Sequence, residues 1–163
     1  MTDMAKVICI CGRICSGKTT YARKLLRQSR AVLLSCDEIT LALFGGDAGE
    51  KHDEYVERTQ GYLLRKSLEL LENGIDVVLD WGFWMKEERD EARKFYVDHG
   101  ASCEFHGIEI PDDLWQERLQ KRNAAVLAGD GTAYYVDEGL ASKFSGIYEP
   151  PAENEIDFWI RNG

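Results

Sequence analysis

One eight-residue segment near the start of the chain constrains the fold more than any other feature. It is Gly12-Arg13-Ile14-Cys15-Ser16-Gly17-Lys18-Thr19, which has the pattern G-x-x-x-x-G-K-[ST]. An apolar run at 7–11 precedes it, and a stretch typical of a helix begins at Lys18. This order of strand, glycine-rich loop and helix lets backbone N–H groups converge on phosphate oxygens. A glycine-rich turn without a ligand is the alternative, and the eight matched positions with both flanks argue against it.

The loop predicts how a nucleoside triphosphate is held. The helix that follows points the positive end of its dipole at the same anion. We expect Lys18 to reach the β- and γ-phosphates and the Thr19 hydroxyl to bind Mg²⁺. ATP and Mg²⁺ are therefore the expected cofactors. The residues expected to bind them are Gly12, Arg13, Ile14, Cys15, Ser16, Gly17, Lys18, Thr19 and Thr20.

Length and composition are those of one globular domain over residues 1–163. The chain is 44% hydrophobic, and no run approaches the ~20 apolar residues of a membrane span. The N-terminal residues lack the layout of a signal peptide. The five cysteines are odd in number and contain no C-x-x-C pair, which argues against a disulfide framework. These features predict a cytoplasmic protein without membrane association, either a monomer or a homodimer.

The net charge of −9 bears on the substrate. Proteins that grip a nucleic-acid backbone usually present a basic face or stripe. Here the lysines and arginines are scattered along the sequence. The charge therefore argues against a polynucleotide substrate, while a short oligonucleotide end stays open.

Apolar runs and helical spacing alternate along the chain. Strands are predicted at 7–11, 31–35, 76–80, 103–110 and 157–160. Helices are predicted at 18–28, 52–73, 86–99 and 111–126, with a loop at 44–49 and no clear period at 128–151. This alternation predicts a three-layer α/β fold with a mainly parallel five-stranded sheet. Ligands of such sheets lie outside the carboxyl ends of the strands, so the loop, Asp37 and Asp80 are expected along one edge.

Two carboxylates are candidates for the chemistry. Asp80 closes an apolar strand, where it could bind Mg²⁺ through water, face the acceptor, or cap the next turn. Asp37 leaves the strand next to the loop-bearing one, and could accept the proton of an acceptor hydroxyl. Asp37 could also cap a helix at 39–44, and the two roles are compatible. Glu38 competes with Asp37 for the role of base, although its neighbouring position should point it elsewhere.

Two arginines could supply positive charge over the transferred group. Arg118 and Arg122 are four residues apart, so they share one face of the predicted helix at 111–126. On that face they could stabilise the charge spread over a triphosphate. Surface helices also carry arginines for solubility, and spacing alone does not separate the two readings.

Large aromatic side chains follow Asp80 directly. Trp81, Phe83 and Trp84 could form an apolar acceptor pocket, or they could cap the core beneath the next helix. Arg89 could reach this turn, although a solvated helix face explains it equally well. The expected substrate pocket therefore comprises Asp37, Asp80, Trp81, Phe83, Trp84 and Arg89.

Several motifs occur in an order that is familiar from one family. They lie at 12–19, 34–38, 77–84, 87–89, 115–123 and 148–151. In this order the chain resembles the P-loop kinases related to zeta toxin, chloramphenicol phosphotransferase and polynucleotide kinase. The resemblance implies an adenylate-kinase-like sheet with a short lid, Mg-ATP, a base at Asp37 and lid arginines at Arg118 and Arg122. It also favours a position near the adenine for Glu149-Pro150-Pro151.

One position departs from the polynucleotide kinases of this family, which carry an arginine three residues after the catalytic Asp. This chain has Thr40 there. We therefore expect a kinase that transfers the γ-phosphate of ATP to an alcohol group of a small molecule. A 5′-hydroxyl polynucleotide or nucleoside kinase is one alternative. A nucleotide-regulated binding module with slow hydrolysis is another, from a different class.

Overall fold

Strands and helices alternate in the computed structural model, which describes residues 4–45, 49–129 and 136–161. The strands are β1 (Lys6–Cys11), β2 (Ala31–Leu34), β3 (Asp76–Gly82), β4 (Ser102–Glu109) and β5 (Phe158–Arg161). The helices are α1 (Lys18–Gln28), α2 (Cys36–Phe44), α3 (His52–Glu72), α4 (Lys86–Asp98), α5 (Asp112–Leu127) and α6 (Glu138–Ile147). Within the described ranges, no helix is both long and apolar enough to cross a membrane.

The described strands form one sheet of five, in the order β2-β3-β1-β4-β5. Every neighbouring pair is parallel, which confirms the α/β prediction and makes the sheet parallel throughout. The chain runs from β1 outward to β2, returns to β3 beside β1, and then crosses to β4 on the other side. The strand order therefore reverses at β1, which is the place where such sheets bind ligands.

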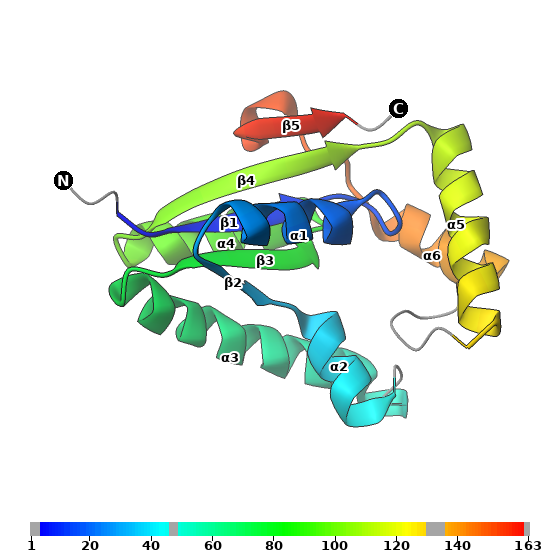
Figure 1. Cartoon of the computed structure of the whole chain (residues 1–163), viewed down its shortest axis with the longest axis horizontal. Coiled ribbons are helices and arrows are strands. Elements are labelled where there is room, and N and C mark those ends of the chain that lie inside the picture. The colour runs from blue at the N-terminus through cyan, green and yellow to red at the C-terminus, as the bar shows by residue number, and fades with distance from the viewer. Residues whose placement is uncertain (1–3, 46–48, 130–135, 162–163) are drawn as a thin grey trace.

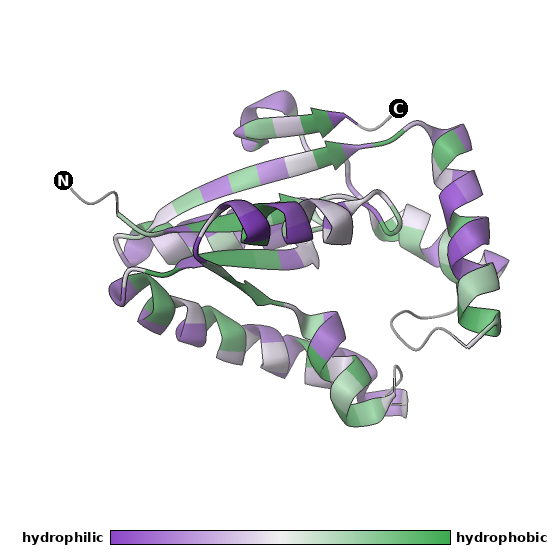
Figure 2. Ribbon diagram, in the orientation of Figure 1, coloured by the Kyte–Doolittle hydropathy of each residue, from purple (hydrophilic) through white to green (hydrophobic). Residues whose placement is uncertain are grey.

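The two faces of the sheet are covered by different helices, because successive strand residues point to opposite faces. Val7, Cys9 and Cys11 of β1 pack on the face covered by α3 and α4, whereas Ile8 and Ile10 pack with α1. Figure 1 shows α1 in front of the sheet and α4 behind it. Figure 2 shows that apolar residues dominate β3 while strongly hydrophilic residues lie along the visible side of α1.

The end of β3 is irregular. Cys9 pairs with Leu79, but Cys11 pairs with Gly82, so β3 carries one more residue than β1 over this interval. Such a bulge re-aims the side chains beside it and is common near active sites. The strand was predicted to close at Asp80, and in the structure it continues past the bulge to Gly82.

Some element ends differ from the predictions for local reasons. Pro111 was expected as the first residue of a helix, but its backbone is extended (ψ 146°) and the helix starts at Asp112. The helix α6 was not predicted; the Asp137 side chain caps it by accepting from the N–H of Leu140 at 2.7 Å. The predicted loop at 44–49 includes residues 46–48, which lie outside the described residues.

Candidate active site

The phosphate-binding loop leaves the central strand as predicted. Its first N–H, that of Gly12, donates to the Gly82 carbonyl at 2.9 Å, which ties the loop to the end of β3. A Cβ at Gly12 would come within 2.7 Å of the buried Ser16 Oγ, so this position requires glycine. Gly17 has a φ of 107°, which a side chain would strain, and α1 begins directly after it.

Lys18 lies folded over its own loop. Its Nζ donates to the Arg13 carbonyl at 3.0 Å, within the curve of the backbone. Desolvation lowers the pKa of Lys18, and the nearby carboxylates of Asp80 and Asp37 oppose that change. Carboxylates from two different parts of the sequence therefore lie close enough to act on this ammonium.

Thr19 and Asp80 meet at the ends of β1 and β3. The Thr19 hydroxyl donates to Asp80 Oδ2 at 3.4 Å. Burial raises the pKa of the Asp80 carboxyl, Lys18 opposes the rise, and the negative charge of Asp37 adds to it. A hydroxyl beside a partly desolvated carboxylate is the kind of oxygen pair that holds Mg²⁺ next to nucleotide phosphates. The residues present therefore fit the cation that the loop implies.

Asp37 lies in the first turn of α2 and is exposed. The helix is capped by Ser35, whose side chain accepts from the N–H of Glu38 at 3.2 Å. The alternative that Asp37 serves as the helix cap is therefore wrong, because Ser35 does so. The Asp37 carboxylate is left exposed at the edge of the sheet where Asp80 and Lys18 lie.

The two arginines of α5 point at the loop. Arg118 Nη1 donates to the Ser16 carbonyl at 3.3 Å, and Arg122 Nη1 contacts Cys15 Sγ at 3.5 Å. The Nε of Arg122 is buried and has no hydrogen-bond partner among the described residues. These contacts agree with the position expected for lid arginines; their roles stay predictions. The reading of both as solvated surface residues does not agree with their partial burial.

Trp115 and Arg13 fasten α5 to the loop. Trp115 Nε1 donates to the Ile14 carbonyl at 2.5 Å. The guanidinium of Arg13 lies 4.3 Å from the centre of the Trp115 ring and donates to Asp112 at 2.6 Å. The sequence did not predict a role for Trp115, because an apolar residue at this position of a helix indicates only core packing.

The turn after β3 divides the aromatic cluster that was predicted as one pocket. Trp84 Nε1 donates to the Gly12 carbonyl at 3.2 Å, and its ring lies 4.8 Å from that of Phe144 in α6. Trp84 therefore braces the loop, and its place in an acceptor pocket stays a prediction. Phe83 has a positive φ of 47°, an uncommon backbone conformation, and its ring packs against Phe105 in the core.

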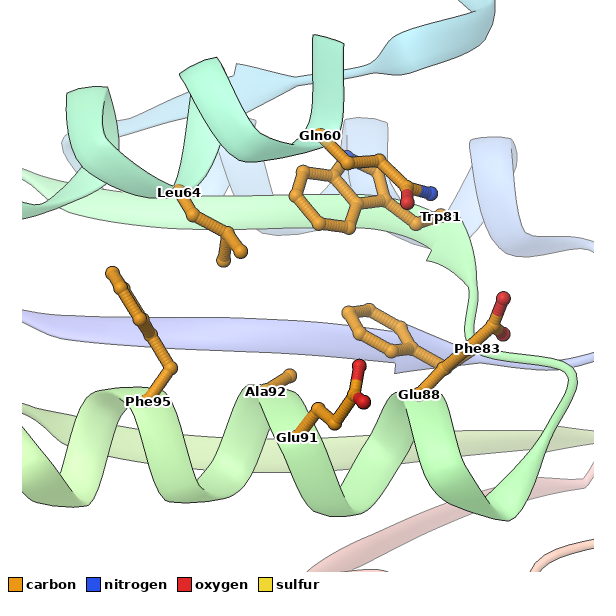
Figure 3. A pocket seen from close by; sticks show the side chains of 8 residues that line it. All are labelled: Gln60, Leu64, Trp81, Phe83, Glu88, Glu91, Ala92 and Phe95. Atoms are coloured by element: carbon orange, nitrogen blue, oxygen red, sulfur yellow. The ribbon is translucent and has the colours of Figure 1, made fainter. Parts of the chain in front are cut away.

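Trp81 and Phe83 line a pocket of about 270 Å³ between α3 and α4 (Figure 3). Their rings are stacked, with centres 5.7 Å apart and planes inclined by 20°. Trp81 Nε1 donates to the Leu34 carbonyl at 2.9 Å, which joins the pocket to the end of β2. The remaining lining residues are Gln60, Leu64, Glu88, Glu91, Ala92 and Phe95.

Arg89 has a different place from the one expected. It is 1% exposed, pairs with Glu155 at 3.0 Å and donates to the Phe83 carbonyl at 2.9 Å. The alternative that it lies on a solvated face is therefore wrong. Arg89 fastens α4 to the turn after β3, and its place in the substrate pocket stays a prediction. The segment around Glu149 lies beside this turn, since its N–H donates to the Trp84 carbonyl at 2.7 Å. Its position near the adenine stays a prediction.

Comparison with known proteins agrees with this geometry. The family model described as AAA domain matches residues 7–140, which include the loop, both carboxylates and both α5 arginines. No curated protein matches the sequence. The APS kinase CysC of Mycobacterium tuberculosis, solved with AMPPNP and APS, is 20% identical with a TM-score of 0.67. That match covers 97% of this chain and 88% of the kinase.

Two further solved structures share the fold. A chain of the Pnkp1/Rnl/Hen1 RNA repair complex is 21% identical with a TM-score of 0.71; the match covers 88% of this chain but 44% of that one. The chain thus spans less than half of that repair protein. A sugar kinase from Janibacter sp. is 14% identical with a TM-score of 0.65, over 96% of this chain and 85% of that one. At these identities the likeness establishes the P-loop kinase fold.

Proposed function

The chain belongs to the AAA domain family, and from that premise we propose that it is an ATP-dependent kinase. It transfers the γ-phosphate of Mg-ATP to a hydroxyl group of a small molecule. The observation that carries the proposal is the pair of Thr19 and Asp80, 3.4 Å apart beside Lys18, with Asp37 close enough to act on both charges. Phosphoryl transfer depends on this kind of positioning and charge balance more than on covalent chemistry.

The donor is held by the loop. Backbone N–H groups of residues 12–19 and the start of α1 face the phosphates, and Lys18 exchanges its bond to the Arg13 carbonyl for phosphate oxygens. Thr19 and Asp80 are the residues that hold Mg²⁺. When bound, Mg²⁺ neutralises charge on the β- and γ-phosphates.

The acceptor is activated by Asp37. Its carboxylate is exposed at the first turn of α2, so it can accept the proton of an incoming hydroxyl. Arg118 and Arg122 reach over the loop from α5 and stabilise the negative charge that spreads over the transferred group. The buried Nε of Arg122, which lacks a partner among the described residues, supports this orientation.

A screen with labelled ATP tests the proposal. The acceptors are hydroxyl-bearing antibiotics, sugars, nucleosides and short oligonucleotides, and the readout is label transferred to the acceptor. We expect transfer to a small molecule, lost in Asp37→Asn while ATP binding persists. Equal turnover by Asp37→Asn would contradict the role of this carboxylate.

A 5′-hydroxyl polynucleotide kinase is the second candidate, and the fold shared with a chain of an RNA repair complex favours including it. Thr40 is 6% exposed and bonded to the Cys36 carbonyl, so the arginine of polynucleotide kinases has no counterpart there. Transfer confined to oligonucleotides, falling steeply with salt, would support this candidate. Failure of every acceptor, together with a partner that binds only the ATP form, would support a binding module.

A further inference from the structure

We propose that the pocket between α3 and α4 binds the body of the acceptor, and that this acceptor carries a positively charged amino group beside an apolar or aromatic body. The inference rests on the proposed kinase function and names its substrate class. It is carried by the shape of the pocket, the charges on its wall, and the position of the pocket beside the carboxyl end of β3.

The walls select a small apolar body. The stacked rings of Trp81 and Phe83 form one wall at the sheet, and Leu64 and Phe95 close the far end (Figure 3). The volume of about 270 Å³ lies near the lower end of known ligand sites, which begin at ~300 Å³. A molecule with one or two rings fits this space, whereas several stacked nucleotides do not.

The charges on the wall are negative. Glu88 and Glu91 belong to the lining, which includes no Lys, Arg or His among the residues that the structure describes. The Glu91 carboxylate points into the space between the helices in Figure 3, and it has no ion pair within the described part of the chain. An ammonium group there gains a carboxylate partner.

An anionic acceptor finds the opposite environment. A phosphate or sulfate group in this pocket would lie among carboxylates with no cation on the wall, which is unfavourable at short range. The cations of the site, Lys18, Arg118 and Arg122, gather instead at the phosphate-binding loop. The two halves of the site are therefore matched to partners of opposite charge.

The pocket also has a direction. In Figure 3, Trp81, Phe83, Gln60 and Glu88 lie at the end nearest the carboxyl end of β3, while Leu64 and Phe95 lie at the other. Trp81 follows Asp80 in sequence and is bonded to Leu34, three residues before Asp37. An acceptor with its ring between Leu64 and Phe95 thus presents its outer end to the edge of the sheet where both aspartates lie.

Three probes of nearly equal shape test the charge requirement: 2-amino-1-phenylethanol, 1-phenyl-1,2-ethanediol and mandelic acid. They carry an amine, a hydroxyl and a carboxylate at the same position. Calorimetry with the full chain in a non-hydrolysable ATP analogue and Mg²⁺ should show that the amine binds at least ~10-fold more tightly than the diol. Mandelic acid should bind more weakly than both. Equal binding of the three probes, or no binding by any, would overturn the inference.

Variants localise the effect. Glu91→Gln should bring the binding of the amine to within ~2-fold of that of the diol, because it removes the charge partner. Glu87→Gln is the matched control, since Glu87 is an exposed glutamate of the same helix outside the pocket lining. Leu64→Trp should weaken both probes by filling the pocket, with ATP binding as the measure of an intact fold. Equal loss of amine binding in the two glutamate variants would contradict the assignment.

The proposed function can fail separately. Tight amine binding that depends on Glu91, without transfer of label to any acceptor, would support the amine-binding pocket and contradict the kinase function. Transfer of label to an acceptor whose binding ignores Glu91 and Leu64 substitutions would retain the kinase and reject the pocket.

Discussion

The donor and acceptor sides of this site are built in different ways. The donor side is a continuous segment, residues 12–19. Its backbone is held by hydrogen bonds to Gly82, Trp84 and Trp115, which are far from it in the sequence. The acceptor side that we propose is a cavity between two helices, lined largely by apolar side chains. The shape of the loop is therefore held through its backbone atoms, whereas a cavity wall changes with each side chain.

The largest expected effect separates the two sides. Lys18→Ala should lower the rate of transfer by about 10³-fold or more, because it removes the cation that faces the β- and γ-phosphates. Binding of 2-amino-1-phenylethanol to the pocket should change little. Calorimetry and labelled-ATP assays measure the two quantities, with Lys24→Ala, an exposed lysine of the same helix, as control. Loss of amine binding in Lys18→Ala would show that the two sides are not independent.

The next largest effect concerns Asp37, which is proposed to act where the donor and the acceptor meet. Asp37→Asn should lower the rate by about 10²- to 10³-fold while the affinities for ATP and for the acceptor stay within a few-fold, since only the proton acceptor is lost. Single-turnover kinetics with saturating substrates isolates the chemical step. Glu38→Gln, the neighbouring exposed carboxylate, is the matched control. A rate loss as large in Glu38→Gln would transfer the role to that residue.

The turn after β3 carries Trp84, which contacts the loop, and Phe83, which lines the pocket. Loss of the ion pair that supports this turn should therefore affect both sides. Arg89→Met leaves the buried Glu155 carboxylate without its partner and should lower the free energy of unfolding by about 3–5 kcal/mol. Urea denaturation measures this change. The exposed pair of Arg161 and Glu109 is the comparison, and Glu109→Gln should cost little. Similar losses in both pairs would contradict the structural role of Arg89.

A smaller effect should be confined to the donor side. Trp84→Phe keeps a ring but removes the N–H that donates to the Gly12 carbonyl, so stability should fall by about 1 kcal/mol. The affinity for ATP should fall a few-fold, and amine binding should not change. Trp159→Phe is the control, because its buried Nε1 has no partner among the described residues. An equal loss in that variant would assign the effect to ring size.

The smallest effect is a dependence on pH. The hydrogen bond from Arg89 is the main reason that the pKa of the Glu155 carboxyl is lowered in the folded protein. In the unfolded chain a glutamate has a pKa of about 4.3. The pair therefore stabilises the fold above that pH, and this contribution is lost as the pH falls through the lower, folded value. Unfolding curves between neutral pH and about pH 3 should show a shallower acid slope in Glu155→Gln. An unchanged slope would contradict the linkage.

The sequence predicted the local structure of the phosphate-binding loop well because the loop's spacing and flanks are local. The range of α1 was predicted to the residue, and the strands were placed within one or two residues at most ends. The helix α6 was missed, since its ten residues include two glycines and follow an uneven mixture of side chains. Its position depends on packing against the side of the loop, which no local pattern contains.

The aromatic residues after Asp80 were predicted less well, because all three rings were assigned to one pocket. Alternation along the chain places Trp81 and Phe83 on one side and Trp84 on the other. Trp84 accordingly contacts the loop, while the other two rings line the pocket between α3 and α4. Arg89 was assigned to the surface or the substrate because nothing near it in sequence reveals Glu155, 66 residues away.

The alternation of side chains along β3 also has a consequence for how this scaffold can be altered. Asp80, which faces Thr19, and Trp81, which faces the pocket, are adjacent in sequence but lie on opposite sides of the sheet. Mutational libraries restricted to Gln60, Leu64, Glu91 and Phe95 would then change acceptor preference while the phosphate-handling groups stay in place. The same separation offers a natural lineage a way to acquire new acceptors by point substitutions on α3 and α4 without rebuilding its catalytic edge.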